Sequence, residues 1–522
     1  MNEIAELLQQ AKERDIAVYL RQDELVIRFP RETRPDQLFL ERLRSNKSRL
    51  CEYFRESGIS EADKVTIRKH AEPKLVHEGI KYYDIYPALV YWLDDTDVEF
   101  KNKLHGVLKF RLTGIFDQSL FGKAIGYTVA RHETLRACFR GIDGRFYMSV
   151  SEQAEQANYI EYKDVRQDSD QGRWNDYSDF IGVEFDVEKG PLFLTRLLKT
   201  KDDEYILSFW MHHILFDGWS TEVMVKDIFT AYYSYLYGNE PGLPALQYHY
   251  KEYLDYLNRF SERHYQRDFE YWQRKFPPGL PKEMIIPGSK VTEGQYQVAG
   301  ECKTYRQVIE GGSVKALNGL VARHSTTLAI VLQAILKLYL SRLTGANDIL
   351  VATEVFGRDM LPEAEQQIGL YSMMRVIRTL FDGDEDIHEA IRKVKRSNEE
   401  MQEFVAFPLL DAICRSLPQG EGILGRTCKV TVNYNDVSGY FINNADGSAF
   451  SGKGLKVDYI GSEGDDVPIV WDFDVHYYNL KDKIDVVIIY RCDLYDEPVI
   501  RQITTGYLDL IEQIAGASII NH

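Results

Sequence analysis

The sequence predicts a mixed α/β protein, because short apolar strand-like runs alternate with longer runs of helical spacing. Residues 204–210 are rich in β-branched and aromatic side chains without a helical period, which is typical of a buried strand. Over 221–237 the apolar residues recur at helical spacing and end at Gly238. The same order is expected earlier in the chain, with a strand over 107–112 and a helix over 119–131.

The loop between residues 210 and 221 carries the chain's most distinctive polar residues. His212 and His213 follow the strand directly, Asp217 lies before the helix, and Ser220 is expected to cap that helix. Loops held between rigid elements commonly carry catalytic groups, and a histidine there suits a general base. Two other interpretations stay open. Either histidine alone is most often structural, and a His-His pair with Asp217 resembles a metal site but has no third ligand at useful spacing nearby.

Composition narrows the class of protein. The chain has 522 residues, enough for more than one domain, with 44% hydrophobic and 27% charged residues. A net charge of −17 argues against nucleic acid as a partner, since phosphate binding needs a basic surface. Six scattered cysteines without a CxxC pair indicate neither a disulfide nor a zinc framework. The first residues lack a signal peptide and no apolar run reaches membrane-spanning length, so we expect a cytoplasmic protein without a membrane partner.

Residues 1–57 have the pattern of a small separate α+β module. A helical face at the start is followed by two short strands over 16–20 and 25–29, which the polar residues 21–24 join as a hairpin. A further helical stretch begins at Pro35. The polar, mixed residues 58–79 are then expected to form a linker.

This order of helix, hairpin and helices resembles the TubC-type N-terminal docking domain of megasynthetases. The resemblance implies that the module receives a short C-terminal tail from the preceding synthetase. The hairpin edge suits strand addition, and Arg21, Arg28, Arg31 and Arg34 are placed to meet an acidic tail. The alternative is a helical cap that only packs on the main domain.

The main domain carries several motifs of one enzyme family. Residues 212–220, HHILFDGWS, resemble the HHxxxDG signature of nonribosomal peptide synthetase condensation domains. Residues 131–139, RHETLRACF, are similar to the family's RHExLRxxF motif, and residues 351–358 match its strand-to-loop segment ending in Gly-Arg. Residues 490–496 resemble its closing YxxDLFD pattern. The resemblance covers roughly residues 80–517.

Three positions depart from the family pattern. Leu89 lies in the segment that replaces the usual SxAQ, Met373 stands where an asparagine is usual, and Phe404 replaces the histidine of a His-Gln pair. These departures leave the histidine motif intact. They bear on substrate preference and make the surroundings of Met373 more apolar.

The resemblance implies a two-lobed fold like that of chloramphenicol acetyltransferase, a pseudo-dimer with a central tunnel entered from both sides. The expected lobes are residues 80–265 and 266–522. His213 is the expected catalytic residue, acting on the attacking amine as a base or as an orienting group, and the backbone N–H of Gly218 is expected to face the same centre. The remaining expected site residues are the structural His212 and Asp217, the latter salt-bridged to Arg131 or Arg136, and the tunnel residues Trp219, Ser220 and Met373.

The implied activity is peptide-bond formation between two substrates held as thioesters. A donor carrier protein and an acceptor carrier protein supply phosphopantetheine arms, so the chain itself is expected to bind neither a cofactor nor a metal. The chain contains no GxSxG motif or Cys-His arrangement that would provide a covalent nucleophile. Three alternatives stay open: a non-catalytic docking or gating platform, ester formation, and epimerisation.

Overall fold

The computed structural model divides the chain into two units, residues 1–67 and 68–522. The division after Ile67 falls inside the segment predicted to be a linker. The structure describes residues 4, 7, 11, 17–21, 24–28, 37–56, 67–93, 105–152, 159–167, 185–275, 284–290, 300–358, 363–404, 428–436, 450–463, 469 and 471–520.

The first unit contains the predicted hairpin. Strands β1 (Ala17–Arg21) and β2 (Glu24–Arg28) pair in antiparallel register, and helices α2 (Gln37–Ser45) and α3 (Lys47–Glu56) follow. Its small core consists of Ile4, Leu7, Ala11, Phe39, Leu43, Leu50 and Cys51. Of the arginines predicted to meet a docking tail, Arg21 and Arg28 belong to the two strands, while Arg31 and Arg34 lie outside the described residues.

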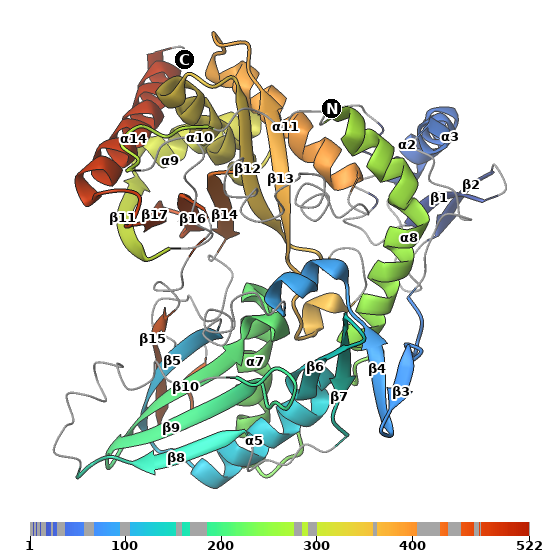
Figure 1. Ribbon diagram of the computed structural model, residues 1–522, viewed down its shortest axis with the longest axis vertical. Coiled ribbons are helices and arrows are strands. Elements are labelled where there is room, and N and C mark those ends of the chain that lie inside the picture. Colours follow the sequence, from blue (N-terminus) through green and yellow to red (C-terminus); the bar gives the residue numbers. More distant parts are fainter. Residues whose placement is uncertain are drawn as a thin grey trace. The chain divides into compact units, whose positions relative to one another are not determined.

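The first sheet of the second unit carries the histidine loop at one strand end (Figure 1). Its strands, in spatial order, are β15 (Leu455–Glu463), β5 (His105–Gly114), β10 (Glu204–His212), β9 (Phe193–Lys201) and β8 (Ile160–Asp164). Only the β8–β9 pair is parallel. Residues 205–212 of the central strand β10 are all buried, so the strand is covered on both faces. This explains why its sequence is continuously apolar instead of alternating.

Two helices pack together beside this sheet, α5 (Gln118–Arg131) and α7 (Gly218–Leu236). Aromatic rings fill the space near them: Phe121 of α5 lies 5.7 Å from Tyr232 of α7, and Phe116 lies 5.0 Å from Tyr205 of β10. This packing fixes helix α7 against α5. The loop that precedes α7 is therefore attached to a rigid element.

The second sheet has six strands. In spatial order they are β11 (Cys302–Glu310), β17 (Lys483–Arg491), β16 (Phe473–Asn479), β14 (Val430–Asp436), β12 (Asp348–Val355) and β13 (Met373–Leu380). The helices described in this half are α9 (Gly312–His324), α10 (Leu328–Thr344), α11 (Ile387–Glu403) and α14 (Glu497–Ile520). Apolar side chains of the sheet and of these helices form the largest core cluster of the half.

Strand β15 corrects the predicted lobe boundaries. The sequence assigned every residue after 265 to the second lobe, yet β15 pairs with β5 in the first sheet. The apolar face of the strand explains this position, because Leu455 and Val457 are buried there and Val457 lies opposite Leu112. The second half of the chain thus contributes one strand to the first sheet.

The remaining elements of the second unit are a long helix, a smaller sheet and several short 3₁₀ helices. Helix α8 (Tyr250–Lys275) runs across the predicted boundary at residue 265. A four-stranded sheet consists of β3 (Leu75–His77), β4 (Ile80–Asp84), β7 (Arg145–Val150) and β6 (Ala137–Ile142). The described residues also include the short 3₁₀ helices η2 (Pro87–Trp92), η4 (Glu133–Arg136), η7 (His213–Leu215) and η8 (Ala364–Gln366). Within the described ranges no single helix has the length and apolar composition to cross a membrane. Only α9 and α10 taken together, bent by 105°, meet that criterion.

Candidate active site

His212 ends strand β10 and starts the loop. Its side chain is completely buried, and its Nδ1 accepts a hydrogen bond from the backbone N–H of Ile214 at 3.2 Å. The ring also meets Phe185 edge-on, with 6.4 Å between centroids. These contacts turn the chain from strand into η7 and make His212 part of the frame of the loop.

His213 is the first residue of η7 and is half-buried. Its ring stacks on Phe216, with centroids 5.1 Å apart and planes inclined by 15°. Phe216 in turn packs against Gly106 of β5, where an added Cβ would lie 2.5 Å from the phenyl ring. A glycine at position 106 is therefore needed to seat the ring that orients the His213 imidazole.

Asp217, and not Ser220, caps helix α7. Asp217 Oδ1 accepts hydrogen bonds from the backbone N–H and from the hydroxyl of Ser220, both at 2.8 Å. The sequence assigned the cap and a tunnel position to Ser220, but this residue is completely buried. Its hydroxyl also lies 2.7 Å from the carbonyl of Gly369, so Ser220 belongs to the bracing of the loop.

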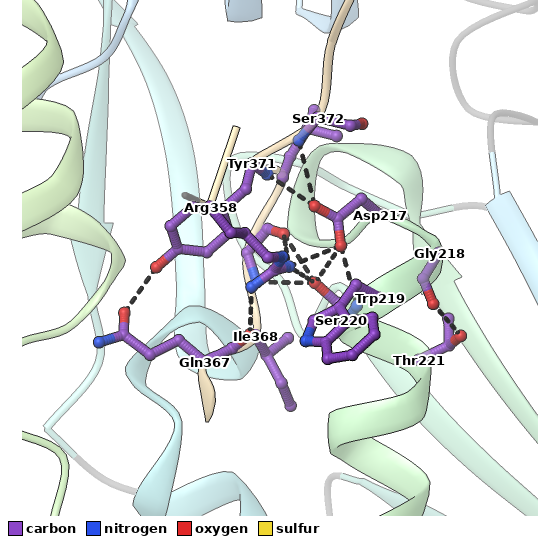
Figure 2. Close-up of polar contacts among 12 residues, drawn as sticks. Asp217, Gly218, Trp219, Ser220, Thr221, Arg358, Gln367, Ile368, Tyr371 and Ser372 are labelled. Atoms are coloured by element: carbon purple, nitrogen blue, oxygen red, sulfur yellow. Dashed lines mark hydrogen bonds and ion pairs between the residues drawn. The ribbon is translucent and has the colours of Figure 1, made fainter. Parts of the chain in front are cut away.

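The ion-pair partner of Asp217 is Arg358, a fully buried residue that follows strand β12 (Figure 2). Arg358 Nη2 lies 2.6 Å from Asp217 Oδ1 and 2.8 Å from the Ser220 hydroxyl. Nη1 donates to the carbonyls of Ala364 and Gln367 at 2.6 and 2.8 Å. The second half of the chain thus holds the histidine loop through one guanidinium.

The second carboxylate oxygen of Asp217 is occupied as well. Oδ2 accepts the backbone N–H groups of Tyr371 and Ser372 at 3.0 and 3.1 Å, just before strand β13 (Figure 2). The Arg358 guanidinium also lies 4.1 Å from the ring centroid of Tyr371, as a cation–π contact. A buried charge pair needs further hydrogen bonds to offset its desolvation. Here backbone groups supply most of them, while Arg358 Nε has no partner among the described residues.

The predicted salt bridge from Asp217 to Arg131 or Arg136 is wrong. Arg131 Nε pairs instead with Asp227, further along α7, at 2.9 Å, and His132 Nε2 lies 2.8 Å from the same carboxylate. Burial lowers the pKa of His132 below its ordinary value. Arg136 donates to backbone carbonyls, including that of Val129 at 3.1 Å. The RHE motif therefore braces the body of α7 and not the loop.

No function is predicted for Arg358 from the sequence, although this residue ends the segment 351–358 that resembles the family's Gly-Arg motif. Gly357 has φ +67, and an added Cβ there would lie 2.0 Å from the carbonyl oxygen of Tyr371. Only glycine permits this close approach, which directs Arg358 inward. An arginine after a strand-terminal glycine was the available signal.

Three further predicted site residues lie around the loop. Trp219 Nε1 donates to the carbonyl of Glu365 at 2.8 Å, and its ring meets Phe356 edge-on at 5.5 Å. Met373 is half-buried at the start of β13. A Cβ added at Gly218 would meet nothing within 4 Å, so the backbone there borders open space. In the part of the chain that the structure describes, no three His, Cys, Asp or Glu side chains are grouped to hold a metal ion.

Comparison with known proteins identifies the family. The family model of the condensation domain matches residues 102–518, most of the chain. The chain belongs to the condensation domain family. Nonribosomal peptide synthetase kk1B of Curvularia clavata is 23% identical over 436 residues, which cover 81% of this chain and 3% of that protein. Malpinin synthetase of Mortierella alpina is 26% identical over 298 residues, covering 56% of this chain and 4% of that protein. This condensation domain thus spans a small part of these relatives.

Solved structures agree with the predicted fold. The X-domain from teicoplanin biosynthesis matches with a TM-score of 0.72 at 19% identity, covering 86% of this chain and 97% of that one. The EpoB cyclization-docking bidomain from Sorangium cellulosum matches with a TM-score of 0.71 at 17% identity, covering 98% of both chains. The first condensation domain of the calcium-dependent antibiotic synthetase, in complex with a substrate analogue, gives 0.64 at 18% identity, covering 83% and 97%. The prediction of a two-lobed α/β fold like that of chloramphenicol acetyltransferase is confirmed.

Proposed function

We propose that this condensation domain joins a donor acyl or peptidyl thioester to the amine of an aminoacyl thioester, in nonribosomal peptide synthesis. An upstream carrier protein presents the donor and a downstream carrier presents the acceptor, each on its own phosphopantetheine arm. The observation that carries the proposal is the complete histidine loop. His213 is oriented by Phe216, and Asp217 is held by Arg358 from the other half of the domain.

Amide formation from a thioester depends more on positioning of the two substrates than on a strong acid or base. The amine nitrogen attacks the thioester carbonyl carbon, a tetrahedral oxyanion forms, and the C–S bond breaks to release the donor carrier's thiol. The nitrogen loses a proton in the process, and that proton ends on the departing sulfur. Because the thioester is already activated, holding the two reactants in register supplies much of the acceleration.

In this proposal His213 acts on the attacking amine, either by accepting its proton or by a hydrogen bond that orients it. A Cβ added at Gly218 would meet nothing within 4 Å, so a substrate can approach this residue closely, and we propose its backbone N–H as the donor to the oxyanion. Trp219 and Met373 are proposed to line the path of the substrates, together with Phe356, whose side chain is 43% exposed beside Trp219.

The bracing of the loop gives this assignment its physical basis. Arg358 and the amides of residues 371–372 hold Asp217 from the second half, while Asp217 caps α7 in the first half. A misplacement of about 1 Å in a catalytic group costs roughly a factor of 100 in rate. The loop position is therefore coupled to the junction between the two halves of the domain.

We also propose that the first unit docks the C-terminal tail of an upstream synthetase. Its two-stranded hairpin leaves strand edges to which an extended tail can add. The likeness to a structure described as a cyclization-docking bidomain extends over 98% of this chain, which supports a docking role for the first unit. Arg21, Arg28, Arg31 and Arg34 are the proposed contacts for an acidic tail.

A second candidate function is a non-catalytic platform, which the likeness to the X-domain favours. Intact-mass spectrometry separates the two. An acyl-loaded upstream carrier and an aminoacyl-loaded downstream carrier are mixed with the protein, and both carriers are weighed. A mass gain on the downstream carrier equal to the donor acyl group supports condensation. No transfer across a panel of donors supports the platform. Epimerisation leaves the mass of the donor carrier unchanged, so chiral chromatography of the hydrolysed donor tests for it separately.

A further inference from the structure

The second sheet carries a group of polar side chains on the face opposite its hydrophobic core. Phe473, Val475 and Tyr477 of β16 belong to that core. Because side chains alternate along a strand, Asp474 and His476 point to the other face. The same alternation on β14 and β12 brings neighbouring polar residues to this face. We call Glu354, Thr431, Asn433, Asp474 and His476 the β-sheet polar cluster.

Strand register holds this cluster together. Thr431 pairs with Asp474 and Asn433 with His476 along the parallel strands β14 and β16, and Ala352 pairs with Thr431 across β12 and β14. Two residues beyond Ala352, the backbone N–H of Glu354 donates to Asn433 Oδ1 at 3.2 Å. The position of each member is thus set by the sheet itself.

Asp474 is fully engaged within the cluster. Its Oδ1 accepts the Thr431 hydroxyl at 2.5 Å and the Asn433 amide at 3.2 Å, and its Oδ2 lies 3.0 Å from His476 Nε2. Although burial opposes ionisation, the His476 ring and the hydroxyl keep the pKa of Asp474 below its ordinary value. The contacts of Asp474 within the cluster therefore favour its ionised form.

Glu354 differs from its neighbours. Among the residues that the structure describes, its carboxylate has neither a hydrogen-bond nor an ion-pair partner, and the residue is exposed to solvent at one side of the cluster. Desolvation by the neighbouring side chains first, and the nearby Asp474 second, raise the pKa of the Glu354 carboxyl above its ordinary value. An acid in such surroundings, reached by solvent and not paired, is available to an incoming group.

The cluster lies close to the histidine loop. Strand β12 leads from Glu354 through Gly357 to Arg358, whose guanidinium contacts Asp217. Four residues span at most roughly 14 Å, so Glu354 is within that backbone distance of the residue that braces the loop. Asp217 also contributes to the rise in the pKa of Glu354, which agrees with this proximity.

We infer that the β-sheet polar cluster is a subsite for a positively charged group of a substrate, a side-chain ammonium or guanidinium, with Glu354 as its ion-pair partner. The inference rests on the proposed condensation function and names a class of substrate for it. A substrate cation placed against the Glu354 carboxylate would form a charge-assisted contact, which a neutral side chain of the same length does not form.

Binding of stable substrate analogues tests the inference without requiring turnover. The probes are pantetheine amides of lysine and of norleucine, which have similar length and differ in charge. Each is made with a free α-amine, as an acceptor mimic, and with an acetylated α-amine, as a donor mimic. Affinities are measured by calorimetry for the wild-type protein, for Glu354→Gln, and for the matched control Glu310→Gln, which changes an exposed carboxylate at the end of the edge strand β11.

In one of the two mimics we expect the lysyl compound to bind at least about tenfold tighter than the norleucyl compound, as one charge-assisted contact allows. This preference should disappear in Glu354→Gln and persist in Glu310→Gln. A preference in the acetylated mimic identifies the donor as the basic residue, and a preference in the free-amine mimic identifies the acceptor. Equal binding of lysyl and norleucyl compounds in both arms, or a preference that survives in Glu354→Gln, would overturn the inference. Failure of the condensation proposal would appear separately, as absence of transfer between loaded carriers.

Discussion

Replacement of Arg358 by methionine tests the bracing of the histidine loop. The substitution keeps most of the side-chain volume but leaves Asp217 as a buried carboxylate without its cation. Removing one partner of a buried ion pair costs about 3–5 kcal/mol of unfolding free energy. Asp217 retains four donors, from the backbone and hydroxyl of Ser220 and the amides of Tyr371 and Ser372. We therefore expect a loss near the lower limit, about 3 kcal/mol.

The same substitution should lower the rate of condensation, because the loop loses its charged anchor in the second half of the domain and keeps only the backbone contacts of residues 369–372. Urea unfolding gives the change in stability, and a single-turnover assay with loaded carriers gives the change in rate. Arg131→Met is the matched control. It breaks the ion pair with Asp227, yet it leaves His132 on that carboxylate and the Asp217 loop untouched. A loss below about 1 kcal/mol in Arg358→Met, well under the cost of a broken buried pair, would refute the reasoning. So would an equal loss of rate in Arg131→Met.

Three further predictions follow from buried groups and from the loop. Burial lowers the pKa of Lys337, in α10, from 10.5 to about 7. The folded state therefore binds this proton less well than the unfolded state, and the stability of wild type relative to Lys337→Met should rise as pH increases from 7 towards 10.5, measured by urea unfolding. The pKa of Glu354 is raised from 4.5 to about 7, so the folded state binds this proton more tightly than the unfolded state does. The stability that this proton provides is complete below pH 4.5 and is lost as pH rises through 7. The same measurement on Glu354→Gln should show that this loss is abolished, and an unchanged pH profile would contradict the assignment. Gly218→Ala should fold with little change in stability, because the added Cβ would meet nothing within 4 Å. Any loss of transfer rate would then report on contact with substrate, and a large fall in its melting temperature would contradict the geometry.

The sequence predicted the secondary structure around the site well, because its signals are local. The strand over 204–210 and the helix over 221–237 correspond to β10 and α7, and the short helix η7 and the capping residue Asp217 lie between them. The hairpin of the first unit also follows from a short-range pattern, two β-rich runs around a polar turn. Such features depend on neighbours in the chain, which a single sequence displays.

The partner of Asp217 could not be predicted in the same way. Arg131, Arg136 and Arg358 are all arginines near family motifs, and sequence spacing does not rank them by distance in space. Tertiary packing decides which arginine pairs with Asp217. Gly357, just after β12, lets the backbone approach Tyr371 closely, and Arg358 then enters the core. Strand β15 is a similar case, because a long-range crossing between the sheets leaves no local trace.

The most direct measurement of the central claim is the single-turnover rate of His213→Ala with loaded donor and acceptor carriers, compared with wild type. The imidazole stacks on Phe216 and lies outside the Asp217–Arg358 network, so the variant should fold with a nearly unchanged unfolding midpoint. The account predicts that transfer falls by a factor of about 100 or more, the usual contribution of a positioned acid or base. Transfer at the wild-type rate by a folded His213→Ala protein would contradict it.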